Sequence, residues 1–169
     1  FILQGKGDLT VAVLSYGATI HSIYYQGKDL VLGYDTLDGY VHGTSYQGAT
    51  IGRYANRIAG GQFRLHDKLY QLDKNENGLH HLHGGNAGFS KRNWKVIQLE
   101  ETDEPSIKLG MESPDGDGGY PGNLSMTVTI KVSEDNRLSF TYEGICDKDT
   151  IWNPTNHCYF NLNGWDSGD

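Results

Sequence analysis

Histidine is the side chain best suited to move protons near neutral pH, because its pKa lies close to neutrality. Residues 78–85 have the sequence Gly-Leu-His-His-Leu-His-Gly-Gly, which places His80, His81 and His83 between glycines. Glycine allows a ligand or a second stretch of backbone to approach closely. If this segment is a strand, His81 and His83 share one face and His80 points to the other. The pattern indicates either acid–base chemistry or histidines that are packed or exposed without a role.

Three histidines within four residues could also bind a metal ion. Zinc or iron would need a further ligand, from His157 or from a carboxylate. No Asp or Glu stands at a supporting spacing, so we expect no metal. The acidic, glycine-rich residues 113–122 lack the ligand spacing and the closing Glu of an EF-hand. We expect a long turn there rather than a calcium site.

Residues 153–162 divide into two faces if they form a strand, because side chains alternate along a strand. One face is a polar row around a single histidine, and the other is expected to face the core. The polar row comprises Asn153, Thr155, His157, Tyr159 and Asn161, and the opposite face comprises Asn156, Cys158, Phe160 and Leu162. The polar row could hydrogen-bond a polyhydroxylated ligand. An edge strand with a solvated polar face, which Pro154 would suit, explains the pattern equally well.

A third polar segment, residues 52–61, contains Arg53, Asn56 and Arg57. A guanidinium group has fixed donors that suit an oxygen-rich ligand, and an amide offers both a donor and an acceptor. Alone this signal is weak, because arginine is common on protein surfaces.

The elements that must position these segments are strands, because the dominant hydrophobic period is two. Apolar and polar residues alternate strictly over residues 124–132 and again over 138–142, with a turn between them, which predicts a hairpin. Residues 63–65 and 69–72 predict a second, shorter hairpin. We find no convincing amphipathic helix. The 169 residues therefore predict one all-β sandwich or barrel-like domain.

Composition excludes several classes of partner. Asp and Glu number 21 against 14 for Lys and Arg, giving a net charge of −7. Nucleic-acid and anionic membrane surfaces require clustered positive charge, so we expect neither partner. No apolar run approaches the roughly 20 residues that a membrane-spanning helix needs. Cys146 and Cys158 are too few for a disulfide framework, so we expect free thiols and a cytoplasmic location.

Several motifs occur together and in a fixed order along the chain. They are Leu-Ser-Tyr-Gly-Ala-Thr-Ile at 14–20, Gly-Arg-Tyr-Ala-Asn-Arg-Ile at 52–58, Leu-His-Gly-Gly at 82–85 followed by Gly88-Phe89, Ser-Pro-Asp-Gly at 113–116, Gly-Tyr-Pro-Gly at 119–122 and Asn-Pro-Thr-Asn-His-Cys-Tyr-Phe-Asn-Leu at 153–162. In this combination the chain resembles the aldose 1-epimerase (galactose mutarotase) family over nearly its whole length.

The resemblance implies an antiparallel β-supersandwich that interconverts the α and β anomers of hexoses such as galactose and glucose, without a cofactor. It implies that His157 is the general acid toward the sugar ring oxygen and that His83 binds and polarises the sugar. Asn56 and Arg57 would bind sugar hydroxyls, and Tyr159 would lie beside the acid. The expected partner is a small hexose, and the expected assembly is a monomer or a weak dimer.

The sequence departs from the family at its C-terminal side. The family's general base is a glutamate far downstream, and no such position exists before residue 169. We therefore expect residues 1–169 to be a single domain that is truncated on the C-terminal side, and the chain alone to be inactive. Two alternatives remain open: a noncatalytic carbohydrate-binding β-sandwich, and a sugar-phosphate 1-epimerase. The latter would need basic residues at the site, for which Arg64, Lys91 and Arg92 are candidates.

Overall fold

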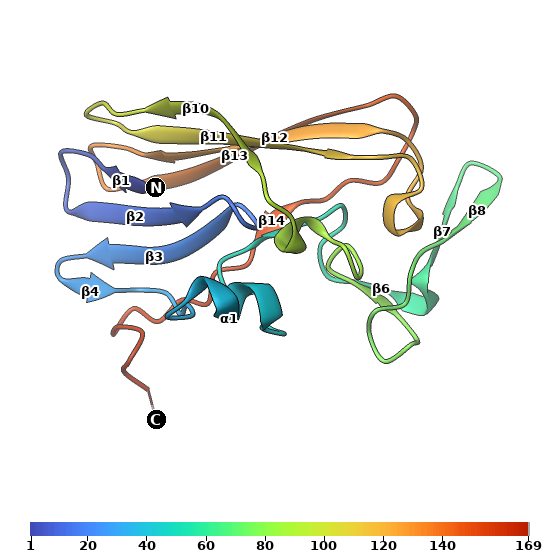
Figure 1. The fold of residues 1–169 in the computed structure, drawn as a ribbon, viewed down its shortest axis with the longest axis horizontal. Coiled ribbons are helices and arrows are strands. Elements are labelled where there is room, and N and C mark those ends of the chain that lie inside the picture. Colours follow the sequence, from blue (N-terminus) through green and yellow to red (C-terminus); the bar gives the residue numbers. More distant parts are fainter. Residues whose placement is uncertain (169) are drawn as a thin grey trace.

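The chain forms two antiparallel sheets of four strands each, in a computed structural model that describes residues 1–168. The first sheet has the order β1 (Ile2–Gln4), β2 (Leu9–Leu14), β3 (Thr19–Tyr25) and β4 (Lys28–Asp29). The second has the order β10 (Lys95–Glu100), β11 (Ser106–Ser113), β12 (Leu124–Val132) and β13 (Leu138–Cys146). In both sheets neighbours in sequence are neighbours in space, and Figure 1 shows the second sheet above the first. The all-β antiparallel sandwich predicted from the sequence is confirmed.

The core lies between these two sheets, and β12 packs against β1 and β2. The alternating apolar residues of β12 are each at most 2% exposed; they are Leu124, Met126, Val128, Ile130 and Val132. Alternation places one set of side chains inward and the intervening Ser, Thr and Lys residues outward. The predicted hairpin is confirmed by the register of β12 with β13, which continues to Cys146.

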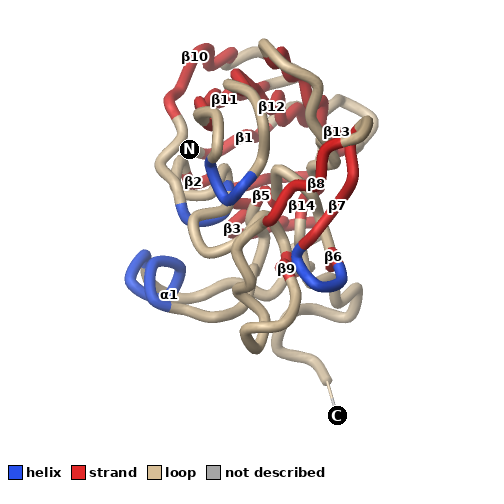
Figure 2. Tube along the Cα trace, turned by 90° about the vertical axis from the view of Figure 1, so that its right-hand side faces the viewer, coloured by secondary structure: helices blue, strands red, loops and turns tan. Residues whose placement is uncertain are grey.

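Short elements form the remainder of the molecule. Three strand pairs are β5 (Thr50–Ile51) with β14 (Thr155–Asn156), β6 (Arg57–Ile58) with β9 (His81–Leu82), and β7 (Gln62–Leu65) with β8 (Lys68–Gln71). The last pair is the second predicted hairpin. Three 3-10 turns occur at Ala59–Gly61, Phe89–Lys91 and Asp117–Gly119. Figure 2 shows β6, β9 and β14 grouped below the second sheet. No helix within residues 1–168 is long and apolar enough to cross a membrane.

One short helix, α1 (Leu37–His42), occurs in the structure, although the sequence shows no convincing amphipathic helix. The Thr36 hydroxyl accepts a hydrogen bond from the Gly39 N–H at 3.4 Å, which is an N-cap interaction. Tyr40 is buried, and its hydroxyl lies 2.8 Å from Nδ1 of His21. A helix of six residues is held by these local and tertiary contacts and is too short to show a helical period.

The expectation that one face of residues 153–162 belongs to the core holds for Cys158, which is partly buried and packs against the core, but not for Phe160 and Leu162. Only Thr155–Asn156 is a strand, and Phe160 and Leu162 are 62% and 75% exposed. The segment turns to pair with residues 30–32 instead: the Leu32 N–H donates to the Tyr159 carbonyl at 3.0 Å, and the Asn161 N–H donates to the Leu30 carbonyl at 2.9 Å. This pairing ends the regular alternation that the expectation required.

Candidate active site

Short strand pairs bring the predicted motif segments together. Because β6 pairs with β9, the Asn56–Arg57 step lies beside the turn that carries His83. Because β14 pairs with β5, the segment that carries His157 runs beside residues 50–51. A parallel bridge between Tyr54 and Asn153 joins the same two regions. Backbone pairing therefore brings together the three polar segments, residues 52–61, 78–85 and 153–162.

Asn56 and His83 contact each other directly through two hydrogen bonds. The Asn56 N–H donates to Nδ1 of His83 at 3.0 Å, and the His83 N–H donates to the Asn56 carbonyl at 3.0 Å. Both residues have positive φ values, 66° for Asn56 and 53° for His83. Asparagine tolerates this left-handed region better than most residues. Two predicted site residues are thus brought together by the backbone.

The glycine after His83 is required by a close approach of two backbones. Gly84 has a φ of 87°, and a Cβ on Gly84 would lie 1.6 Å from the carbonyl oxygen of Gly52. No side chain fits there, because such a contact is far inside van der Waals distance. The Leu-His-Gly-Gly motif at 82–85 therefore allows the turn at His83 to pack directly against the backbone of the Gly-Arg-Tyr segment at 52–54.

The environment of His83 favours its neutral form. Burial lowers the pKa of His83 to about 4, and the nearby His157 and Arg57 add to this decrease while Glu76 opposes it. Because Nδ1 accepts the Asn56 N–H, the proton of the neutral ring must be on Nε2. At neutral pH His83 can therefore donate one hydrogen bond from Nε2 to a ligand oxygen.

His157 lies against His83 and against a third predicted residue, Tyr159. The His157 ring centroid is 5.0 Å from that of His83, with the rings at 86°, and 5.0 Å from that of Tyr159, with the rings at 37°. His157 is half-buried rather than enclosed in the core. Among residues 1–168, no group hydrogen-bonds to its imidazole, so its nitrogens remain available to a ligand.

Arg57 forms an ion pair that sequence reasoning missed. Its Nε and Nη2 both donate to the carboxylate of Glu76, a two-point geometry that fixes the plane of the guanidinium. The pair raises the pKa of Arg57 and lowers the pKa of Glu76. Nη1 makes no bond to this carboxylate and keeps its donors for a ligand. The one available signal was an acidic residue inside the histidine-rich loop.

Tyr46 is a second residue that sequence reasoning missed. Its ring centroid lies 4.7 Å from that of His83 and 5.8 Å from that of His157. Tyr46 belongs to none of the motifs found in the sequence, so the sequence alone gave no signal for these contacts.

The other two histidines of the motif do not join this site. His81 is fully buried, where Nε2 lies 2.7 Å from the Tyr120 hydroxyl and Nδ1 lies 2.7 Å from the Asp73 carbonyl. Nδ1 of His80 accepts the Gly60 N–H at 3.1 Å. The prediction that His81 and His83 share one face of a strand is wrong. Strand β9 ends at Leu82, and the backbone of His83 has a left-handed conformation. Residues 1–168 contain no cluster of three or more His, Cys, Asp or Glu side chains that could hold a metal ion.

Arg53, a ligand candidate from its sequence motif, is instead a buried structural residue that is 1% exposed. Its guanidinium donates to the carbonyls of Ser113, Pro114, Pro121 and Gly122 at 2.7–3.0 Å. These bonds fix the predicted long turn at residues 113–122 to the segment that leads to Asn56.

The rest of the polar row is used in backbone and loop contacts. Asn153 exchanges backbone hydrogen bonds with Arg53 and Ala55, and the Asn161 amide donates to the Ser167 carbonyl. The side-chain hydroxyl of Thr155 donates to the Asn156 carbonyl at 3.3 Å.

The three basic residues considered for a phosphate have protein partners. Lys91 donates to the Gly43 carbonyl at 2.8 Å, and Arg92 pairs with Asp117 at 2.6 Å. Arg64 donates to the Asp67 carbonyl at 3.4 Å.

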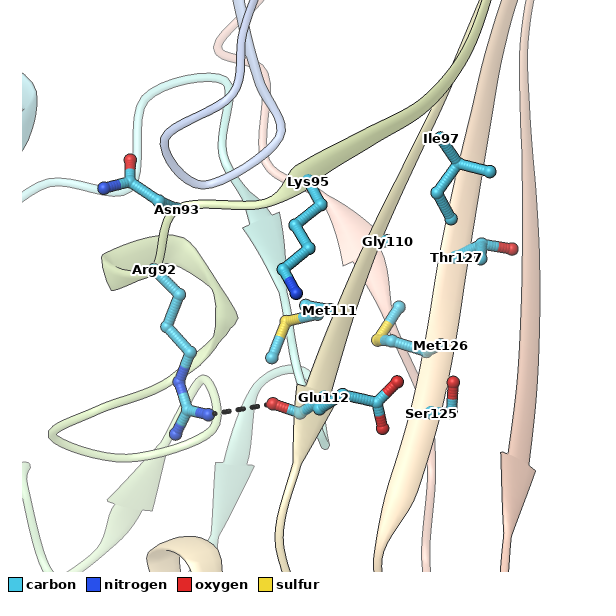
Figure 3. Close-up of a pocket in the computed structure, with 10 residues that line it drawn as sticks. All are labelled: Arg92, Asn93, Lys95, Ile97, Gly110, Met111, Glu112, Ser125, Met126 and Thr127. Atoms are coloured by element: carbon cyan, nitrogen blue, oxygen red, sulfur yellow. Dashed lines mark hydrogen bonds between the residues drawn. The ribbon is translucent and has the colours of Figure 1, made fainter.

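A separate hollow of about 280 Å³ lies on the outer side of β10–β12 (Figure 3). Its wall includes Arg92, Lys95, Met111 and Glu112, and Arg92 donates to the Glu112 carbonyl at 3.4 Å. None of the five predicted site residues lines it. The histidine pair and this hollow are therefore distinct features of the surface.

Comparison with known proteins assigns the family. The aldose 1-epimerase family model matches residues 1–168. The chain is 42% identical to an aldose 1-epimerase of Haemophilus influenzae over 98% of this chain and 48% of that protein. It is 41% identical to a galactose mutarotase of Bos taurus over 97% of this chain and 47% of that protein.

Solved structures agree with this assignment. The crystal structure of a galactose 1-epimerase from Lactobacillus acidophilus matches with a TM-score of 0.88 and 32% identity, over 95% of this chain and 48% of that one. The chain spans about half the length of the curated relatives it matches. On the family match and on these similarities, the chain belongs to the aldose 1-epimerase family.

Proposed function

We propose that this chain carries the acid side of an active site that interconverts the α and β anomers of hexoses such as galactose and glucose. The observation that supports this most directly is the His83–His157 pair, with ring centroids 5.0 Å apart and His83 hydrogen-bonded to Asn56. Family membership supports the class of reaction. The residues expected to bind sugar, Asn56, Arg57 and Tyr159, border the same pair.

The proposed chemistry opens and closes the sugar ring by paired proton transfers. His157 donates a proton to the ring oxygen as the bond between that oxygen and C1 breaks. A base removes the proton of the C1 hydroxyl, and C1 becomes the carbonyl carbon of the open-chain aldehyde. Rotation about the C1–C2 bond presents the other face of the carbonyl, and the reverse transfers close the ring as the other anomer. No atom is lost and no electron is transferred, so general acid–base catalysis accounts for the whole reaction.

His83 has a different role from His157 in this scheme. Its lowered pKa keeps it neutral, so it can donate a hydrogen bond from Nε2 without carrying a charge. A neutral donor aimed at a sugar oxygen polarises that oxygen and orients the ring. In this scheme the imidazole of His157 transfers a proton, and the imidazole of His83 positions the substrate.

Arg57 and Asn56 supply the donors and acceptors that sugar hydroxyls need. Glu76 holds the Arg57 guanidinium through Nε and Nη2, which leaves Nη1 as the donor for a hydroxyl. Tyr159 is 41% exposed and offers an aromatic surface beside His157 for the apolar face of a pyranose.

We place the proton acceptor for the C1 hydroxyl, a glutamate by family resemblance, outside residues 1–169. Residues 1–169 alone should then show little or no mutarotation by polarimetry, because the acid at His157 has no matched base. Full activity from these residues alone would refute this assignment.

A comparison of substrates separates this proposal from its two alternatives. The complete gene product is mixed with α-galactose, α-glucose or a hexose phosphate, and rotation is followed against time. Faster mutarotation of the free hexoses supports the proposal. Preference for the phosphate would indicate a sugar-phosphate epimerase. Saturable binding without turnover would indicate a noncatalytic carbohydrate-binding protein.

We further propose that the protein works in a reducing, cytoplasmic environment as a single domain and as a monomer or weak dimer. Both cysteines, Cys146 and Cys158, are free thiols in the structure, which is the state that such a compartment maintains.

A further inference from the structure

Tyr46 is fixed beside His157 by the backbone of its own loop. The Gly48 N–H donates to the His157 carbonyl at 3.0 Å, and the His157 N–H donates to the Ala49 carbonyl at 2.9 Å. The Ala49 N–H in turn donates to the Tyr46 carbonyl at 3.1 Å. Tyr46 and His157 are therefore parts of one hydrogen-bonded unit, although 111 positions separate them in the sequence.

The ring of Tyr46 contacts both imidazoles at once. It meets His83 edge to face, with centroids 4.7 Å apart and an interplanar angle of 64°. It meets His157 at 5.8 Å and 34°. Aromatic pairs at these separations stabilise one relative orientation, with edge-to-face geometry among the favoured arrangements. Tyr46, His83 and His157 thus form a closed triangle of rings.

We propose that Tyr46 is a positioning residue of the sugar site, whose ring holds the His83 and His157 imidazoles at their mutual angle and keeps water from the His83 ring. This inference rests on the proposed function in assigning a task to the two histidines. It assigns Tyr46 no proton transfer.

The effect of Tyr46 comes from its shape rather than from a charge. Burial raises the pKa of Tyr46, with a contribution from the carboxylate of Glu76, so its hydroxyl stays neutral throughout the working pH range. Burial is also the main reason that the pKa of His83 is low, ahead of the charges on His157 and Arg57. An aromatic ring 4.7 Å from His83 is part of what buries it. Removal of the ring should admit water and restore part of the ordinary affinity of His83 for protons.

The test replaces Tyr46 in the complete gene product and measures the pKa of His83 by NMR titration. Y46S removes the ring, Y46F keeps it, and Y24S is a matched control on β3, where Tyr24 is 47% exposed. We expect Y46S to raise the proton affinity of His83 about tenfold or more, which is one pKa unit. Y46F should leave the His83 titration close to that of the wild type, and Y24S should have no effect on it.

Kinetics supply a second readout that a general loss of stability would not produce. In Y46S, kcat/KM relative to the wild type should fall more at pH 5 than at pH 8, because a His83 whose proton affinity has risen about tenfold is about half protonated at pH 5. The charged and titratable neighbours of His83, namely Arg57, Glu76 and His157, are unchanged in this variant. A purely structural defect would reduce kcat/KM equally at both pH values.

Three outcomes would overturn the inference. They are an unchanged His83 pKa in Y46S, a Y46F variant that matches Y46S, and a loss of activity that does not depend on pH. If Y46S does not fold, Y46T takes its place, because its short side chain also leaves the volume of the ring open, and a wild-type His83 titration in Y46T would be equally decisive. The NMR measurement requires no turnover, so failure of the proposed hexose activity would not be confused with failure of this inference.

Discussion

Asn56 and His83 bind each other reciprocally, with the N–H of each donating to an acceptor of the other at 3.0 Å. One of these acceptors is the His83 ring nitrogen Nδ1, so the same contact fixes the position, the tautomer and the donor atom of the imidazole. The proton on Nε2 follows from donation by the Asn56 backbone N–H to Nδ1, which substitution of the Asn56 side chain does not remove directly.

The first prediction concerns stability at low pH. The pKa of His83 is about 4 in the folded protein and close to 6.5 when the chain is unfolded. Between these values the unfolded state binds more protons, so the free energy of unfolding falls as the pH is lowered from 6.5 to about 4. In H83Q this contribution is absent, and the fall should be smaller by about 1–2 kcal/mol, allowing for partial solvent access.

Urea unfolding of wild type and H83Q at several pH values checks this prediction. The neighbours of His83 are the same in both proteins, namely Arg57, Glu76, His157 and Tyr46. The difference between the two curves therefore gives the contribution of the His83 imidazole to the pH dependence of stability. Parallel curves from pH 4 to 7 would show that His83 titrates normally.

The second prediction concerns the Arg57–Glu76 pair. E76Q removes the carboxylate and leaves the guanidinium free to adopt other orientations, so we expect KM for the hexose to rise about three- to tenfold with little change in kcat. Stability should change little, because solvent screens ion pairs near the surface.

The matched control is E143Q, which removes the partner of Lys108 on the second sheet. It should leave both kinetic constants unchanged. A drop in kcat for E76Q at constant KM would instead mean that Glu76 takes part in the chemical step.

The third prediction concerns Gly84. G84A places a methyl group 1.6 Å from the Gly52 carbonyl oxygen and should destabilise the protein by more than about 3 kcal/mol, because the backbones must separate. G27A is an unusually close control, because Gly27 has a φ of 79° and nothing within 4 Å of its added methyl group.

G27A should cost only the strain of a left-handed alanine, about 1 kcal/mol. Thermal unfolding of both variants separates the cost of a positive φ for alanine from the cost of the steric clash with Gly52. Equal losses of stability would mean that the close approach of Gly84 to Gly52 has no structural importance.

The strands of the main sheets were predictable because one face of each is buried. The strict alternation at residues 124–132 corresponds to five inward side chains of β12. In residues 153–162, the same alternation predicted a core face that continues past Cys158, but Phe160 and Leu162 are exposed. The six-residue helix α1 depends on a cap and on the buried Tyr40 rather than on a period.

The residues of the site were predictable in type but not in arrangement. Family resemblance pointed to His83 and His157, and the structure brings them together. The left-handed turn that separates His83 from His81 cannot be deduced from a run of three histidines. Tyr46 and Glu76 reach the site through backbone pairing between segments far apart in the sequence, and no local pattern records such a contact.

The central claim is that His157 supplies the proton to the sugar ring oxygen, and polarimetry of H157A in the complete gene product tests it most directly. Galactose binding is measured in parallel by calorimetry, and H66A, at an exposed histidine paired with Asp149, is the control. We predict that H157A loses turnover about a hundredfold or more while Kd changes by less than about tenfold, and that H66A matches the wild type. Undiminished mutarotation in H157A would contradict the account.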